Sequence, residues 1–171
     1  MSGEIKTNDL AIQSDDQENL EDELKDMIPL ITSERYIPIV EKTNWFKSIE
    51  TFSGISENII SHLILSMDDL EFAKGEFIIR QGETGSSMFV IYSGEVEILI
   101  SGKMISKEGP GHIFGERSVL ISDPREASVR TTQDSRIFCL EQEVLFMCFK
   151  ENVELAKKLL AALFNELESH R

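Results

Sequence analysis

The sequence predicts an α+β protein in which an eight-stranded antiparallel β-roll, similar to a jelly roll, is flanked by N-terminal and C-terminal helices. Eight of the ten glycines lie between positions 75 and 115, where they separate short runs of β-branched and aromatic residues. Helical periodicity occurs on both sides of this region. Short strands at intervals of about ten residues, with turn signals between them, are typical of small antiparallel barrels and rolls.

The first part of the chain is strongly acidic. Residues 1–26 hold nine acidic residues and two lysines, which accounts for half of the formal net charge of −14. A run of this kind is typical of a solvated arm. We therefore predict a flexible tail over 1–27, and leave open an intramolecular lid or a docking segment for a basic partner.

A helical N-terminal subdomain is predicted over 28–68. Pro29 and Pro38 interrupt it, so its helices are short. The clearest helix begins at Ser56, a residue type that favours the N-cap position. Its apolar residues share one face and are Ile59, Ile60, Leu63, Ile64 and Met67.

The β-roll is predicted over 69–140. Its clearest strands are 77–79, 88–92, 95–100, 127–132 and 136–140. Alternation within 95–100 places Val96, Ile98 and Ile100 on one face. Ser101-Gly102-Lys103 is expected to form a tight hairpin connection, and Cys139 is expected in the core.

Two C-terminal helices are predicted over 141–170. The first spans Glu141–Lys150, and Asn152 is expected to cap the second. The apolar stripe of the second helix consists of Leu155, Leu159, Leu160, Leu163, Phe164 and Leu167. Core packing accounts for such a stripe, and a dimer interface through this helix stays open as an additional role.

Composition excludes several classes of function. An acidic chain lacks the basic face that nucleic acids or anionic membranes require, and no apolar run is long enough to span a bilayer. Two cysteines are too few for a disulfide framework, which favours a reducing cytoplasm. The three histidines, His62, His112 and His170, are too far apart to predict a metal site. We therefore expect no metal, no other cofactor and no enzymatic activity, with a metal-dependent jelly-roll enzyme as a remote alternative.

The segment 109–129 interrupts the strands and carries the chemistry. Its apolar middle, Val119-Leu120-Ile121, predicts one helical turn, and Gly115 frees the backbone just before it. The N–H groups at the start of such a turn lack internal partners and can face an anion. Glu116 and Arg125 converge on the same place, where the acid can accept hydrogen bonds from sugar hydroxyls and the arginine can hold a phosphate.

Residues 114–128, called the cassette below, resemble the phosphate-binding cassette of the cyclic nucleotide-binding domain family. The matching motifs are Phe114-Gly115-Glu116 and Pro124-Arg125-Glu126-Ala127-Ser128. Upstream, 75–83 and 89–96 resemble two further strands of that family. The resemblance covers about 45–155 and agrees with the order of the flanking helices.

The resemblance implies a role for each residue of the cassette. Glu116 would accept a hydrogen bond from the ribose 2′-hydroxyl, and Arg125 would pair with the cyclic phosphate. The backbone N–H groups of Ser118 and Ala127 would bind phosphate oxygens, and Gly115 would allow close approach. Further implied residues are the hinge pair Val119 and Leu120, and a lid over the base formed by either Leu163 or Phe164.

Four positions depart from the family pattern. Arg117 replaces the commonest leucine, and Ser118 replaces the usual alanine. Tyr92 stands where kinase regulatory subunits often have an aspartate that braces the arginine, so Arg125 is expected to be held differently. Glu126 replaces a residue that contacts guanine in members preferring cGMP, and strand alternation predicts that it points away from the pocket. We favour cAMP over cGMP.

The resulting hypothesis is a sensor that binds a cyclic nucleotide and signals to a separate effector protein by moving its helices. The alternative is a degenerate roll that binds no nucleotide and acts as a scaffold for protein interactions. In that case Glu116 and Arg125 would form an ordinary salt bridge. Nucleotide binding distinguishes the two.

Overall fold

The computed structural model describes residues 36–158 and 160–161. The predicted tail 1–27, residues 28–35, and the stripe residues Leu159, Leu163, Phe164 and Leu167 lie outside the described residues. The helices are α2 (Ile39–Ser48), η1 (Glu50–Phe52), α3 (Glu57–Leu65), α4 (Glu116–Ile121) and α5 (Gln142–Glu151). The strands are β1 (Asp68–Phe72), β2 (Phe77–Ile79), β3 (Ser87–Ser93), β4 (Val96–Ile100), β5 (Lys103–Glu108), β6 (Ile113–Phe114), β7 (Ser128–Thr131) and β8 (Ser135–Glu141).

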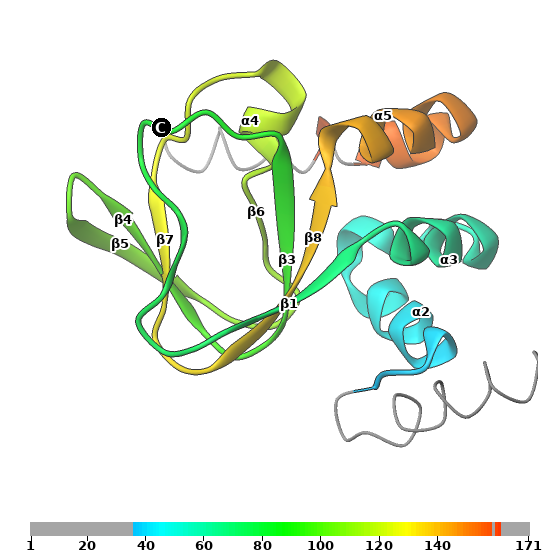
Figure 1. Ribbon diagram of the computed structural model, residues 1–171. Coiled ribbons are helices and arrows are strands. Elements are labelled where there is room, and N and C mark those ends of the chain that lie inside the picture. The colour runs from blue at the N-terminus through cyan, green and yellow to red at the C-terminus, as the bar shows by residue number, and fades with distance from the viewer. Residues whose placement is uncertain (1–35, 159, 162–171) are drawn as a thin grey trace, which may run out of the picture. The chain divides into compact units, whose positions relative to one another are not determined.

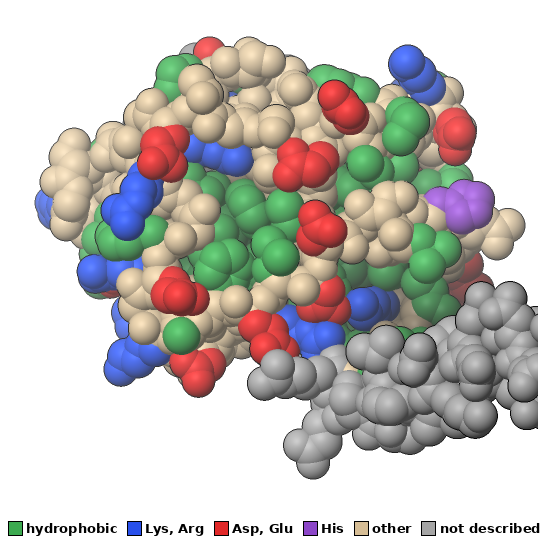
Figure 2. Space-filling model, viewed as in Figure 1, with side chains coloured by type: hydrophobic (Ala, Val, Ile, Leu, Met, Phe, Trp, Pro, Cys, Tyr) green, Lys and Arg blue, Asp and Glu red, His purple; other side chains and the backbone are tan. Residues whose placement is uncertain are grey.

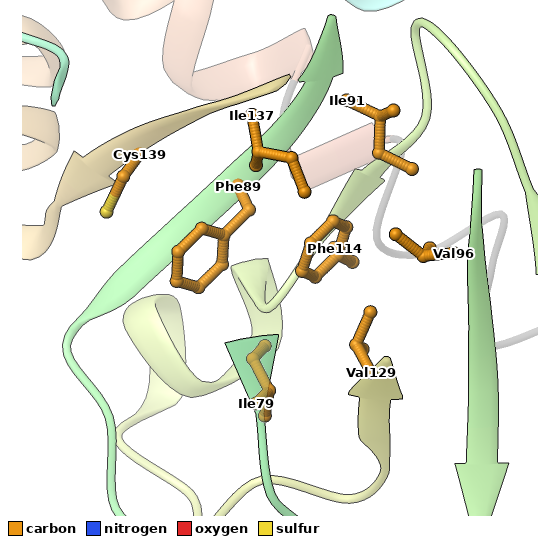
Figure 3. Close-up of a cluster of buried hydrophobic side chains, with 8 residues drawn as sticks. All are labelled: Ile79, Phe89, Ile91, Val96, Phe114, Val129, Ile137 and Cys139. Carbon is orange, nitrogen blue, oxygen red and sulfur yellow. The ribbon is translucent and has the colours of Figure 1, made fainter. Parts of the chain in front are cut away.

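Within the described residues, the eight strands form two four-stranded antiparallel sheets, which confirms the predicted α+β roll (Figure 1). One sheet has the order β1-β8-β3-β6 and the other β2-β7-β4-β5. The core between them takes side chains from both sheets (Figure 3). It includes Phe89 and Phe114, whose rings stack with centroids 5.2 Å apart. Cys139 is buried in the same core, as predicted, and burial raises the pKa of its thiol to about 11.

The strand predicted at 95–100 is present as β4. The register with β5 shifts between Ile98 and Leu99 because β5 has an extra residue there, whereas the pairing of β4 with β7 is regular. Leu99 is buried, while Ile100, at the end of the strand, is 41% exposed. The hairpin prediction is confirmed: Ser101 and Gly102 connect β4 to β5, both with positive φ, which suits a two-residue turn between twisted strands.

The N-terminal helices pack through aromatic and aliphatic side chains. Helix α3 begins after Ser56 as predicted and buries Ile60, Leu63 and Ile64, although the Ser56 side chain makes no capping hydrogen bond. In α2, Phe46 is fully buried, and its ring lies 5.5 Å from that of Phe138 in β8. The helices are therefore anchored on the outer face of the sheet that contains β8.

The C-terminal segment follows the predicted pattern where it is described. Helix α5 begins at Gln142, one residue later than expected. The Asn152 side chain accepts a hydrogen bond from the N–H of Leu155 at 2.8 Å, which confirms the cap. Residues 153–158 and 160–161 are helical. Leu155 is fully buried, whereas Leu160 is 43% exposed.

Asp69 in β1 joins the sheet to α2 by polar contacts. Its carboxylate accepts hydrogen bonds from Arg136 Nε at 2.7 Å and Nη2 at 2.9 Å, and from Lys42 Nζ at 2.9 Å. Burial by itself raises the pKa of this carboxyl, but the bonds from Arg136 and Lys42 outweigh burial and hold the pKa below its usual value. The ionised form is therefore the one that stabilises the fold.

Asp69→Asn is expected to lower the free energy of unfolding by about 1–3 kcal/mol, because charge-assisted hydrogen bonds to two cations are lost. Urea unfolding at pH 7 measures the loss. The stabilisation should be fully present above about pH 4, the ordinary carboxyl range, and should disappear as the pH falls through the lowered pKa of the folded state. Glu57→Gln, which removes the exposed ion pair with Lys47, is the control and should change stability by less than about 0.5 kcal/mol. Equal effects of the two substitutions would contradict the account.

Candidate functional site

The cassette begins where β6 ends and α4 starts. Gly115 has a φ of +79°, which turns the chain from strand into helix. The helical turn predicted around Val119 is present as α4, and it buries Ser118 and Val119. Helix α4 lies at the same end of the roll as the junction between β8 and α5 (Figure 1). The start of α4 and the residues at the beginning of β7 line the same pocket.

Arg125 is a buried cation held by backbone carbonyls. Only 7% of the residue is exposed. Nη1 donates to the carbonyl of Gly115 at 2.8 Å, and Nη2 donates to the carbonyl of Ser87 at 2.6 Å. Desolvation lowers the pKa of the guanidinium, while the nearby charges, including Glu116 and Glu141, act in the opposite direction. Since an arginine stays protonated in proteins, the result is a fixed positive charge in the wall of the site.

The packing around Arg125 requires glycine at two positions. A Cβ atom on Gly115 would lie 2.6 Å from Nη1 of Arg125, and one on Gly85 would collide with the same guanidinium. Sequence reasoning identified Gly115 but missed Gly85. The only available signal was the location of Gly85 in the turn before the strand at 88–92. Many glycines occupy such turns, so this location does not indicate a role in the site.

A pocket opens beside this guanidinium and brings together the seven predicted ligand-binding residues. They are Gly115, Glu116, Arg117, Ser118, Arg125, Glu126 and Ala127. The apolar part of the lining is Ile79, Ile98, Phe114 and Val129, of which only Phe114 belongs to the predicted cassette. His112 also lines the pocket; its Nδ1 lies 3.3 Å from a carboxylate oxygen of Glu108, and its Nε2 is buried without a partner in the described structure. Figure 2 shows hydrophobic side chains at the centre of this view of the roll, with acidic and basic side chains around them.

The prediction that Glu126 points away from the pocket is wrong. Strand β7 begins at Ser128, so Glu126 precedes the region where alternation applies. Its carboxylate lies 2.6 Å from Arg117 Nη1, and both residues line the pocket. Arg117 also approaches Asp123 at 3.7 Å, and its Nε is buried with no hydrogen-bond partner in the described part of the chain. The second arginine of the cassette is thus engaged with acids of the cassette.

Arg125 is held differently from the family pattern, as expected from Tyr92 in place of the bracing aspartate. The ring of Tyr92 packs against Trp45 and Phe138, at centroid distances of 4.9 and 5.4 Å. The carbonyl of Ser87 supports Arg125 instead. Backbone geometry decides this contact, so a side-chain motif could not reveal it. The predicted lid residues Leu163 and Phe164 lie outside the described residues.

No group of three or more His, Cys, Asp or Glu side chains in the described ranges could hold a metal ion. His62 is exposed on α3, and His170 lies outside the described residues. No helix in those ranges is long and apolar enough to cross a bilayer. The pocket described above is therefore the candidate site.

Gly85→Ala is expected to destabilise the fold by about 1–3 kcal/mol, because the new methyl group displaces the Arg125 guanidinium. Gly109→Ala is the matched control, since no heavy atom lies within 4 Å of the added Cβ and its φ is not positive. Thermal unfolding of both variants beside the unchanged protein measures the difference. Tolerance of alanine at 85 would show that the guanidinium is not fixed there.

Sequence comparison supports the resemblance. The model of the "Cyclic nucleotide-binding domain" family matches residues 69–152. The chain is 35% identical over 99 residues to cGMP-dependent protein kinase, isozyme 1, of Drosophila melanogaster, covering 56% of this chain and 13% of that protein. It is 26% identical over 121 residues to the CRP-like cAMP-activated global transcriptional regulator of Mycobacterium tuberculosis, covering 68% of this chain and 54% of that protein. The chain thus spans only part of these relatives.

Solved structures share the fold. The regulatory domain of Toxoplasma gondii PKA, crystallised with cAMP, superimposes with a TM-score of 0.65 at 21% identity, covering 77% of this chain and 50% of that one. A cyclic nucleotide-binding domain from Methylobacillus flagellatus gives a TM-score of 0.64 at 22% identity, covering 77% of both chains. At these identities the structures show the common roll alone. The family model and the cassette motif identify a cyclic nucleotide-binding domain at residues 69–152 of this chain.

Proposed function

We propose that this chain is a sensor that binds a cyclic nucleotide, with cAMP favoured over cGMP, and passes the signal to a separate effector protein. The observation that carries the proposal is Arg125, a buried cation fixed by two carbonyls at the wall of a pocket. Burying such a charge is costly unless it is compensated. A cyclic phosphate, which carries one negative charge and exposed acceptor oxygens, compensates it.

The other residues of the pocket fit the remaining parts of a nucleotide. Glu116, at the first position of α4, is placed to accept from the ribose 2′-hydroxyl. The N–H groups of Ser118 and Ala127 are proposed to bind phosphate oxygens, and Gly115 lets the ligand approach the backbone. The apolar side chains of Ile98 and Val129 provide a surface for uncharged parts of the ligand.

The signal would arise at Val119 and Leu120. Val119 is fully buried and Leu120 partly buried, so α4 cannot shift without changing its packing. A ligand that binds one arrangement of α4 more tightly moves the population towards that arrangement. Movement of the C-terminal helices would then alter the surface that an effector protein meets. A cytoplasmic location belongs to this proposal, since both cysteines are unpaired thiols.

Arg125→Ala is expected to weaken nucleotide binding at least about tenfold, because a charge-assisted hydrogen bond contributes on the order of 1.5–3 kcal/mol. Isothermal titration calorimetry with cAMP and with cGMP measures affinity and base preference, and the unchanged protein should bind at micromolar concentration or below. Arg80→Ala removes the same charge from an exposed position over the Phe77 ring and is the control, with affinity expected within about twofold.

The proposal is overturned if folded, nucleotide-free protein gives neither heat nor thermal stabilisation at millimolar cAMP and cGMP. A ligand that binds only the folded state must raise its stability, so both readouts cannot be silent in a binding protein. The scaffold without nucleotide would then be the better account. Binding that Arg125→Ala leaves unchanged would reject the assigned role of Arg125 while keeping the sensor.

Arg117→Leu is expected to weaken cAMP binding by about threefold to tenfold, because Glu126 then faces the anionic ligand without its partner. Adding Glu126→Gln in the same chain should restore most of the affinity, since the uncompensated charge is gone. A double-mutant cycle by calorimetry measures this coupling. Additive effects of the two substitutions would show that pairing between Arg117 and Glu126 does not affect the affinity for cAMP.

A further inference from the structure

The junction between β8 and α5 contacts the cassette support through Glu141 and Gln142. Glu141 is opposite Ser87 in the β3–β8 ladder, and Gln142 is the first residue of α5. The first N–H groups of a helix lack partners within it. The N–H of Gln142 is satisfied by the carbonyl of Ser86, at 2.7 Å. The start of α5 is therefore fixed to the residues that immediately precede and begin β3.

The Glu141 side chain strengthens this connection. It is linked to Arg125 by Ser87, which contacts both residues. Its carboxylate accepts from the hydroxyl of Ser87 at 2.6 Å and from that of Ser86 at 3.0 Å. Ser87 is the residue whose carbonyl accepts from Arg125 Nη2 at 2.6 Å. Although Glu141 is the N-cap residue of α5, its side chain makes no capping bond to that helix. The carboxylate instead fixes the residue that supports the guanidinium.

The Gln142 side chain contacts helix α4, which lies within the cassette. Its Nε2 donates to the carbonyl of Val119 at 2.5 Å. Val119 is fully buried in α4, and a helix of six residues leaves its last carbonyls without internal partners. Two consecutive residues at the β8–α5 junction thus contact Ser87, which supports Arg125, and Val119, which lies within the cassette.

We infer that Glu141 and Gln142 are positioning residues that tie Arg125, through Ser87, and α4, through Val119, to the first turn of α5. The functional consequence rests on the proposed function. If a nucleotide phosphate binds at Arg125, its binding and the position of α5 are linked, and each affects the other by the same factor.

Charge alone predicts the opposite result for Glu141, which makes the inference testable. Glu141 is an acid close enough to Arg125 to raise the pKa of its guanidinium. Removing an acid near an anion site should strengthen anion binding by electrostatics. Removing a positioning residue should weaken it, because Ser87 and with it Arg125 lose their fixed geometry.

The first experiment is calorimetric titration of the full chain with cAMP. Glu141→Ala is expected to weaken binding by about threefold to tenfold, the loss typical of one or two hydrogen bonds. Glu141→Gln keeps one acceptor oxygen and should stay within about twofold of the unchanged protein. The control is Glu143→Ala, which removes the same charge from an exposed position in the same turn of α5 and should leave affinity equal or higher. Equal or tighter binding by Glu141→Ala overturns the role of Glu141.

The second experiment needs no nucleotide and therefore separates this inference from the proposed function. Amide hydrogen exchange of Gln142→Leu is expected to be about threefold to tenfold faster in both 116–121 and 142–151, because the bond to Val119 is lost. Exchange over 96–108, in the β4–β5 hairpin, should not change. Gln133→Leu, an exposed position between β7 and β8, is the matched control.

The outcomes distinguish the two proposals. Unchanged exchange in 116–121 of Gln142→Leu overturns the tie between α5 and α4, whether or not a nucleotide binds. If the unchanged protein binds neither cAMP nor cGMP, the proposed function fails, and the faster exchange alone supports the tie. Far-ultraviolet circular dichroism and thermal unfolding show that each variant is folded. If the alanine variant at 141 does not fold, the hydrogen exchange of Gln142→Leu keeps the inference testable.

Discussion

The burial of the Arg125 guanidinium is the constraint on which the rest of the site depends. A buried cation needs hydrogen-bond acceptors at fixed distances, and the backbone carbonyls of Gly115 and Ser87 provide them. Because secondary structure holds these carbonyls in place, β3 and the β6–α4 turn also fix the position of the guanidinium. Glycine at 85 and 115 leaves the space that this arrangement requires. The pocket is therefore built around a charge that is held in place.

The β-roll brings together segments that are far apart in the chain. Ser87 and Arg125 are 38 residues apart, yet they are in contact because β3 and β6 pair while the chain returns through β7 to the facing sheet. The core between the sheets sets the spacing of these strands, and the Phe89–Phe114 stack lies directly within it. Tight packing transmits small displacements. A ligand bound as proposed would therefore act on the same packed strands that support α5.

Polar contacts at the end of the roll join the site to the helices. Glu141 and Gln142 bond to Ser86, Ser87 and Val119 without passing through the apolar core. The N-terminal helices are attached at a different place, by Asp69 with its two cations and by the rings around Phe138. The two attachments use different chemistry. Hydrogen bonds join α5 to the residues near the pocket, whereas ion pairs and packed aromatic rings join the N-terminal helices to the sheet.

The sequence alone determined the roll, the helical turn at Val119 and seven of the twelve residues that line the pocket, because local patterns and the cassette motif encode them. It also identified the caps at Ser56 and Asn152 as helix starts. Only the tertiary structure decided that Ile100 is exposed, that Glu126 pairs with Arg117, and that the Ser87 carbonyl supports Arg125. These three outcomes depend on where strands end, where they begin and which backbone groups meet, and periodicity specifies none of them. For the same reason Gly85, Glu141 and Gln142 become visible as parts of the site only when β3, β8 and the cassette are folded together.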